Sequence, residues 1–213
     1  MLQLKQLGIS TGGEKGQEPL FPEVSLTVQD GQILVIMGPS GCGKSTLLAA
    51  IAGNLAPPFQ MTGTIHLGDT ALEQLPAQQR KVGLLYQDDL LFPHMNVLQN
   101  LAFALPASLD RKQRAQRIAQ ALSHADLQGF QHRDISTLSG GERARISLLR
   151  TLLAEPRAIL LDEPFNKLDK TLREQFRDWV FSELRRYRIP TILVTHDADD
   201  CGDNEIYDLV KGE

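Results

Sequence analysis

The chain has 213 residues, a formal net charge of −4 and a sequence pI of about 5.8. This length fits one large α/β domain with a small insertion, and the slightly acidic balance argues against nucleic acid as the main partner. No apolar run approaches the roughly 20 residues that span a bilayer, and the first residues lack the pattern of a signal peptide. The two well-separated cysteines, Cys42 and Cys201, predict a reducing cytosol and no disulfide framework.

The first elements predicted along the chain are strands. Alternation of apolar and polar residues predicts strands over 2–7 and 24–28, with a polar, glycine-rich loop over 11–19 between them. After the tight turn predicted at Asp30-Gly31, the uninterrupted apolar residues 33–37 predict a strand that is buried on both faces, as in a parallel sheet.

A phosphate-binding loop of the form G-x-x-x-x-G-K-S follows this strand and precedes a predicted helix over 46–51. Its glycines let backbone N–H groups approach phosphate oxygens, Lys44 can reach the outer phosphates, and the Ser45 hydroxyl can coordinate Mg²⁺. An ordinary glycine-rich turn is the alternative, and it gives the lysine and the hydroxyl no role. The loop predicts binding of a nucleoside triphosphate by Gly38, Pro39, Ser40, Gly41, Cys42, Gly43, Lys44, Ser45 and Thr46.

The middle of the chain changes from strands to helices. A loop over 54–63 and strands over 64–67 and 82–86 lead into a helical region from 88 to about 137. Helices are expected over 96–105 and 110–125. The expected apolar stripe of the second consists of Ala115, Ile118, Ala119 and Leu122. Its basic residues, Arg111, Lys112, Arg114 and Arg117, are interpreted as a solvated face, since a nucleic-acid patch would interleave aromatic residues.

Strands and helices then alternate to the end of the chain. The pattern predicts helices over 139–154 and 170–187, and strands over 158–161, 191–195 and 206–210. The second helix carries a core stripe of Leu172, Phe176, Trp179, Val180 and Leu184. This alternation predicts an α/β fold with a parallel sheet. We expect a sheet core from residues 1–87 and 138–213, and an inserted helical subdomain over 88–137.

Polar residues stand where three of these strands end, which is where a parallel sheet gathers its ligands. Asp162 is placed to hold Mg²⁺, and Glu163 to activate a water. The alternative is that Asp162-Glu163-Pro164 only ends a strand, which the earlier phosphate loop makes the weaker interpretation. Gln87 and His196 end the other two strands, and each alone would be unremarkable.

The segment Leu138-Ser139-Gly140-Gly141-Glu142 has two compatible interpretations. Ser139 and Glu142 form a capping box for the helix that follows. The two glycines are not needed for capping, and they fit a phosphate that approaches this helix N-terminus.

These motifs, in this order over nearly the whole chain, resemble the ATP-binding subunit of ABC transporters, a member of the P-loop NTPases with an antiparallel β edge. The most specific match is Leu138–Glu142 ahead of Leu-Leu-Asp-Glu-Pro. The stretch 86–100 is similar to importer ATPases, with small bacterial subunits of the thiamine or related type as the nearest fit.

The resemblance implies a head-to-tail homodimer that closes on two ATP molecules, with Mg²⁺ held by Ser45, Gln87 and Asp162. Lys44 would hold phosphates, Glu163 would polarise water, and His196 would bind the γ-phosphate and the water. Ser139, Gly140 and Gly141 of the opposite copy would touch the γ-phosphate, and Asp169 would lie across the dimer seam. The implied partners are an integral membrane permease, reached through Gln87 and the helical subdomain, and a solute-binding protein. The implied location is cytoplasmic, peripheral on the inner face of the cell membrane.

The sequence departs from the family pattern in three places. The motif Leu138–Glu142 corresponds to the signature motif of the family, and Glu142 stands where that motif usually has glutamine. The segment Ser10–Leu20 contains no aromatic residue that could stack on adenine. Phe21 is the nearest aromatic and is expected in the core. The chain after His196 is short, so a C-terminal sensor domain is not expected.

Two other functions stay open at this point. A soluble ABC-type ATPase that acts on DNA or the ribosome would usually carry tandem cassettes, coiled coils or basic extensions, and none is visible. A kinase with a phosphate loop would give Ser139-Gly140-Gly141 no role.

Overall fold

The computed structural model describes residues 1–13 and 16–209, and these form two compact units. Unit 1 comprises Met1–Leu84, Arg157–Glu163 and the chain from Phe181 onward, and unit 2 comprises Leu85–Pro156 and Pro164–Val180. The predicted helical insertion over 88–137 lies within the range of unit 2, and it stays a prediction as a subdomain of its own.

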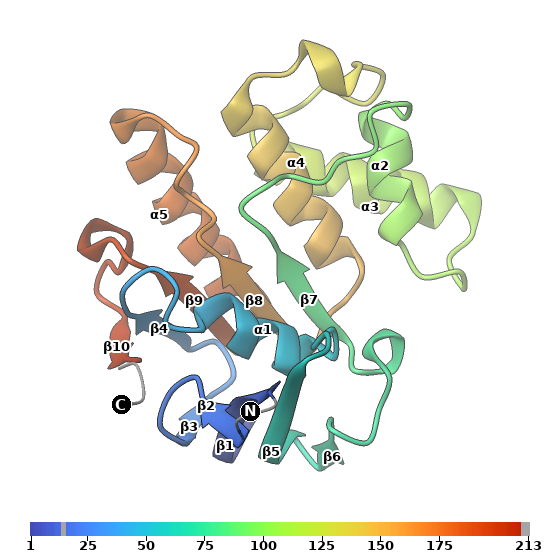
Figure 1. Cartoon of the computed structure of the whole chain (residues 1–213). Helices are drawn as coiled ribbons and strands as arrows, with labels where there is room; N and C mark the ends of the chain where they lie inside the picture. Colours follow the sequence, from blue (N-terminus) through green and yellow to red (C-terminus); the bar gives the residue numbers. More distant parts are fainter. Residues whose placement is uncertain (14–15, 210–213) are drawn as a thin grey trace. The chain divides into compact units, whose positions relative to one another are not determined.

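The parallel sheet of unit 1 has the strand order β10-β4-β9-β8-β7 (Figure 1). Its strands are β4 (Ile33–Met37), β7 (Val82–Leu85), β8 (Ala158–Asp162), β9 (Thr191–Thr195) and β10 (Glu205–Asp208). The three central strands β4, β9 and β8 are almost entirely buried, which confirms the two-sided burial predicted for residues 33–37. Residue 210, the end of the last predicted strand, lies outside the described residues.

An antiparallel sheet accompanies it in the same unit, as the fold class predicts. It has the order β2-β1-β5-β6, with β3 paired to β1. Its strands are β1 (Leu2–Gly13), β2 (Gly16–Pro19), β3 (Val24–Val28), β5 (Phe59–Leu67) and β6 (Thr70–Ala71). Apolar residues from both sheets and from α1 (Lys44–Ala52) form one core.

Two loop predictions are wrong in part, because residues of both segments form strands of this sheet. Residues 11–13 and 16–19, predicted as loop, belong to β1 and β2, which pair through Ser10 opposite Pro19. Residues 59–63, also predicted as loop, form the first half of β5 and pair with β1. The first segment is polar and glycine-rich, and pairing with a partner strand rather than apolar alternation makes it a strand. In the second, Phe59 and Met61 alternate with polar residues and pack against the core.

Unit 2 is helical, with α2, α3 and α4 grouped together in Figure 1. These are α2 (Val97–Ala104), α3 (Arg111–His124) and α4 (Gly140–Leu153), and each begins with a side-chain capping box, at Asn96, Asp110 and Ser139. Unit 2 also contains a 3₁₀ turn at Ile135–Thr137, and unit 1 has such turns at Ala77–Gln79 and Ala198–Asp200. Helix α5 (Lys170–Tyr187) contains the boundary between the units, after Val180.

Two details of α3 differ from the sequence prediction. Ala115 and Ala119 are exposed, and the buried face consists of Ile118, Ala121 and Leu122. The buried face is therefore rotated about the helix axis relative to the predicted apolar stripe. Arg114 is not part of a purely solvated face, because its guanidinium donates to the carbonyls of Ala102, Leu105 and Pro106 at the end of α2.

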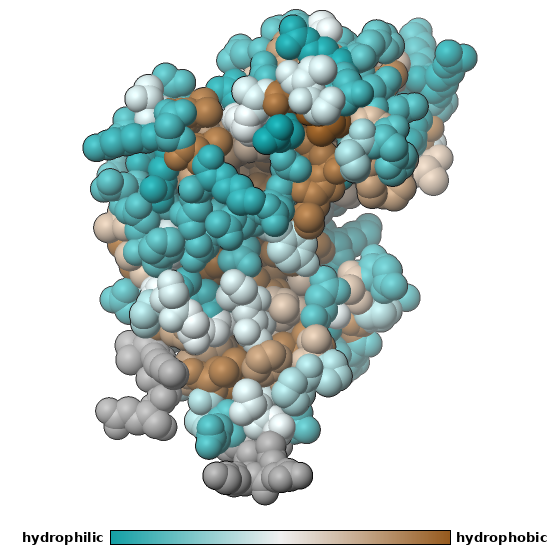
Figure 2. Space-filling view, turned by 45° about the horizontal axis from the view of Figure 1, so that its top comes forward, coloured by the Kyte–Doolittle hydropathy of each residue, from teal (hydrophilic) through white to brown (hydrophobic). Residues whose placement is uncertain are grey.

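Hydrophilic residues cover most of the face in Figure 2, in keeping with a mean hydropathy of −0.19. Among residues 1–13 and 16–209, no helix combines the length and apolarity that crossing a membrane requires. Cys42 and Cys201 are both free and buried.

Candidate functional site

The phosphate loop connects β4 to α1, as predicted, and its glycines have separate structural reasons. Gly41 has φ of +81° and an added Cβ would meet nothing within 4 Å, so this part of the loop is open. Gly43 has φ of +101°, and a Cβ there would lie 2.9 Å from the Phe21 ring. Phe21 is buried, as predicted, and its ring leaves no room for a side chain at position 43 of the loop.

The N-terminus of α1 is suited to an anion. Gly43 occupies the N-cap position and offers no side-chain cap, and the first turn contains no acidic residue. The N–H groups of that turn therefore keep both their positive dipole end and their hydrogen-bonding capacity for a ligand.

Lys44 is nearly fully buried and its ammonium is held by the loop itself. Nζ donates to the carbonyl oxygens of Gly38 at 2.7 Å and Pro39 at 3.0 Å. These contacts place the cation at the edge of the loop, where it can exchange a carbonyl for a phosphate oxygen.

Ser45 and Asp162 bring two hard oxygen donors together. Ser45 Oγ donates to Asp162 Oδ1 at 3.0 Å, although the residues lie on α1 and at the end of β8. Burial raises the pKa of the Asp162 carboxyl, and the hydrogen bond from Ser45 opposes this rise. The donor set fits Mg²⁺, which takes oxygen ligands and keeps several waters.

Glu163 and His196 form a second pair in unit 1. Glu163 Oε1 lies 3.1 Å from His196 Nδ1, because β8 and β9 are adjacent parallel strands that end at the same edge. Glu163 has φ of +46°, a left-handed conformation that is strained for a residue other than glycine, and its N–H donates to Val194 O at 3.0 Å. This geometry turns the carboxylate away from the strand direction, toward His196.

Ser139, Gly140, Gly141 and Asp169 lie in unit 2. Ser139 and Gly140 are exposed at the start of α4, and a Cβ on Gly140 would meet nothing closer than 4.0 Å. Gly141 is buried, and a Cβ there would lie 2.9 Å from Leu172, so packing alone explains this glycine. Asp169 is exposed and caps α5 through Leu172 N at 3.1 Å.

The Glu142 carboxylate turns back onto its own helix. Its Oε2 accepts from Ser139 N at 2.7 Å, and Ser139 Oγ accepts from Glu142 N at 3.3 Å, which confirms the predicted capping box. The backbone N–H of Ser139 is the main cause of a lowered pKa for this carboxyl.

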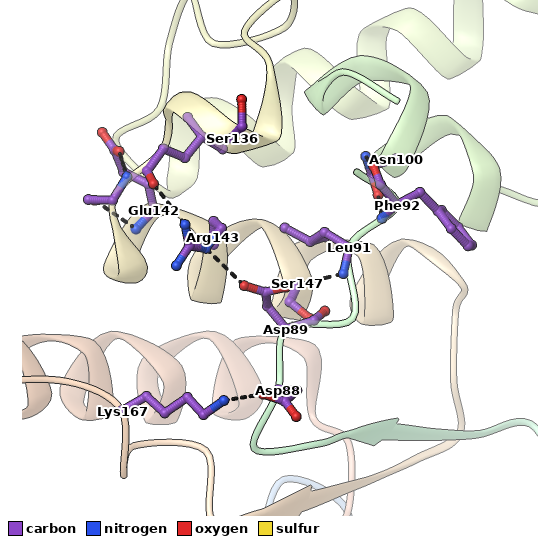
Figure 3. A network of polar contacts seen from close by, with 12 residues as sticks. Asp88, Asp89, Leu91, Phe92, Asn100, Ser136, Glu142, Arg143, Ser147 and Lys167 are labelled. Atoms are coloured by element: carbon purple, nitrogen blue, oxygen red, sulfur yellow. Dashed lines mark hydrogen bonds and ion pairs between the residues drawn. The ribbon is translucent and has the colours of Figure 1, made fainter. Parts of the chain in front are cut away.

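Gln87 follows β7 and is exposed in unit 2, whereas Ser45 and Asp162, the other two predicted metal ligands, lie in unit 1. The residues after Gln87 carry contacts that the sequence did not predict. Asp88 pairs with Lys167, and Asp89 pairs with Arg143 (Figure 3).

Arg80 is another contributor that the sequence did not indicate. It is buried and donates to the carbonyl oxygens of Ala50, Ile51 and Leu75 at 2.8, 2.9 and 2.9 Å. These hydrogen bonds stabilise the C-terminal end of α1, the helix that follows the phosphate loop. A lone arginine after a polar loop gives no pattern that could have identified it.

Comparisons with known proteins agree with this geometry. The family model described as ABC transporter matches residues 21–166. An uncharacterized ABC transporter ATP-binding protein, YnjD, of Escherichia coli (strain K12) is 49% identical over 193 residues, covering 90% of this chain and 89% of that protein. The taurine import ATP-binding protein TauB of Pseudomonas fluorescens (strain Pf0-1) is 40% identical, with 94% of this chain and 74% of the relative covered.

Solved structures extend the likeness to the fold. The dimeric structure of MJ0796, a bacterial ABC transporter cassette, has a TM-score of 0.80 at 26% identity and covers 98% of this chain and 94% of that one. The same cassette in a post-hydrolysis state, bound to ADP and Pi, has the same TM-score and coverage. The chain therefore belongs to the ABC transporter family, as an ATP-binding cassette that hydrolyses ATP.

Proposed function

We propose that this ATPase is the motor subunit of an importer, in which two copies close head to tail on two ATP molecules. The observation that carries the proposal is the division of the motif residues between the units. Unit 1 contains Lys44, Ser45, Asp162, Glu163 and His196, while the exposed Ser139 and Gly140 belong to unit 2. Each ATP is then held by unit 1 and Gln87 of one copy and by Ser139 and Gly140 of the other.

Binding begins at the phosphate loop. Lys44 exchanges the Gly38 and Pro39 carbonyls for outer phosphate oxygens, and the α1 N-terminus receives the inner phosphates. Ser45 and Asp162, with Gln87, are the residues that would hold Mg²⁺, which neutralises developing phosphate charge when it is bound.

Hydrolysis uses the pair at the strand ends. Glu163 orients and deprotonates the attacking water, and His196, 3.1 Å away, keeps the carboxylate in place and contacts the γ-phosphate. The partner's Ser139 and Gly140 complete the γ-phosphate site through the N-terminus of α4, and Asp169 lies at the dimer seam.

The membrane partner is a separate permease. Relatives are named as import ATP-binding proteins for taurine, Fe(3+) ions and sulfate/thiosulfate, and another as a putrescine transport ATP-binding protein, which supports import without identifying the solute of this chain. Residues 87–89 are called the Gln87 segment below. Near this segment, the side chains of Leu90 and Phe103 are 54% and 67% exposed. Such apolar side chains suit a helix of an integral membrane protein. The proposal includes a solute-binding protein in the complex and a cytoplasmic location of the ATPase, peripheral on the inner face of the membrane.

The shared site can be tested by mixing two inactive variants. Lys44→Ala removes the phosphate contact of unit 1, and Ser139→Phe blocks the signature of unit 2. A heterodimer contains one site with both halves intact, so we expect the mixture to release phosphate faster than either variant alone. A mixture no faster than its components would contradict the head-to-tail arrangement, provided both variants retain the wild-type melting temperature.

A further inference from the structure

Asp89 is held by three side chains on one face of α4. Arg143 Nε donates to Asp89 Oδ2 at 3.0 Å, Ser147 Oγ donates to its carbonyl oxygen at 2.7 Å, and Arg150 Nη2 reaches the same oxygen at 3.4 Å (Figure 3 shows the first of these). Residues 143, 147 and 150 are spaced i, i+4, i+7 and share one helix face. Ser147 is buried, so its bond to the segment is shielded from water.

Asp88, the neighbouring residue, points the other way and pairs with Lys167 (Figure 3). Lys167 lies in the segment between β8 and α5, two residues before Asp169, the N-cap of α5. Arg143 lies four residues after Ser139, the N-cap of α4. The two consecutive acids that follow Gln87 thus reach two different elements of unit 2.

These ion pairs border a cavity of about 680 Å³ that is also lined by Gln87 and Gly140. Exposed ion pairs taken one at a time contribute little to stability. Where a cavity replaces close packing, however, the ion pairs decide how one segment is oriented relative to another. Their effect is expected on geometry rather than on the stability of the fold.

We propose that Asp88 and Asp89 are positioning residues that fix the Gln87 segment to the two elements carrying Ser139 and Asp169. The inference rests on the proposed function, in which Gln87 serves one ATP site while Ser139 and Asp169 of the same copy serve the other. A change at Gln87 in one site is then passed through Asp89–Arg143 and Asp88–Lys167 to the opposite site. The two ATP sites of a dimer are coupled by this route.

The test measures phosphate release against ATP concentration for Asp89→Asn, Arg143→Gln and Lys167→Gln. We expect each to lower kcat about three- to tenfold and to bring the Hill coefficient toward 1, with the KM for ATP nearly unchanged. Melting temperatures should stay close to the wild type, because Asp88–Lys167 is exposed and Asp89–Arg143 is only half-buried. The charge exchange Asp89→Arg with Arg143→Asp should recover both kcat and the Hill coefficient.

The matched control is Arg117→Gln, which removes another exposed ion pair of unit 2, with Glu155, that does not touch the Gln87 segment. This variant should leave kcat, the Hill coefficient and the KM for ATP unchanged. Wild-type kcat and Hill coefficient in Asp89→Asn and Lys167→Gln, or failure of the charge exchange to restore them, would overturn the inference. The mixed-variant experiment separates the two proposals, because recovery there together with normal Asp89→Asn kinetics removes only the coupling.

Discussion

Glu163 Oε1 and His196 Nδ1 lie 3.1 Å apart, although 33 positions separate the two residues in the chain. The contact follows from the register of β8 and β9, in which Asp162 pairs with Val194, so the residues after each strand meet. The left-handed φ of Glu163 then directs its carboxylate to the imidazole.

Glu163→Gln should retain ATP binding and lower phosphate release about a hundredfold or more, because the amide cannot accept the proton of the attacking water. The phosphate loop is untouched, so ATP should trap a dimer that size-exclusion chromatography detects. The exposed Glu174→Gln on α5 is the matched control. Full turnover in Glu163→Gln would remove this carboxylate from the mechanism.

Lys44→Ala should weaken ATP binding about ten- to a hundredfold in calorimetry, because a charge-assisted hydrogen bond to phosphate is lost. The substitution also leaves the Gly38 and Pro39 carbonyls without their ammonium donor, so the melting temperature must be measured alongside. Unchanged affinity in a folded variant would contradict the assignment of the loop as a phosphate site.

Asp162→Asn should stabilise the nucleotide-free protein at neutral pH while abolishing Mg²⁺-dependent hydrolysis. Burial raises the folded-state pKa above the ordinary 3.8, so the folded state binds the proton more tightly than the unfolded state. The cost of the charge is therefore absent below the ordinary pKa and fully present above the raised one.

The measurement for Asp162→Asn is the melting temperature at a series of pH values without nucleotide. The advantage of the variant should shrink as the pH falls toward the ordinary pKa of aspartate. Asp69→Asn, at an exposed position, should show no such trend. A variant that is less stable than wild type at neutral pH would show that the hydrogen bond from Ser45 outweighs burial.

Arg80→Ala should lower the free energy of unfolding by about 3 kcal/mol, because three carbonyl acceptors lose a charged donor in a buried place. Two of these carbonyls, of Ala50 and Ile51, belong to the last turn of α1. Urea unfolding measures the loss, and Arg80→Lys should recover part of it. An unchanged midpoint would show that water replaces the guanidinium.

Much of the fold follows from local patterns in the sequence. The buried strands β4, β8 and β9 are built around apolar runs, and the capping residues of α2, α3 and α4 mark where those helices begin. The β1–β2 pairing escaped prediction because its residues are polar, and their strand conformation depends on a partner strand rather than on burial.

The contacts of the candidate site also divide into those that local motifs predict and those that they do not. Ser45 and Asp162 could be paired from their motifs, since strand ends in a parallel sheet meet at one edge. Asp89–Arg143 and Asp88–Lys167 could not, because 54 and 79 residues separate the partners and no short motif contains both. Their contact depends on how the segment after β7 runs within unit 2.

The ammonium of Lys44 has two neutral oxygen partners within the phosphate loop itself. Arrival of a triphosphate is thus an exchange of acceptors around a cation whose stem stays buried, and the lysine need not be withdrawn from solvent. The measured affinity then reports the difference between an anionic and a neutral acceptor rather than the whole strength of the new bond.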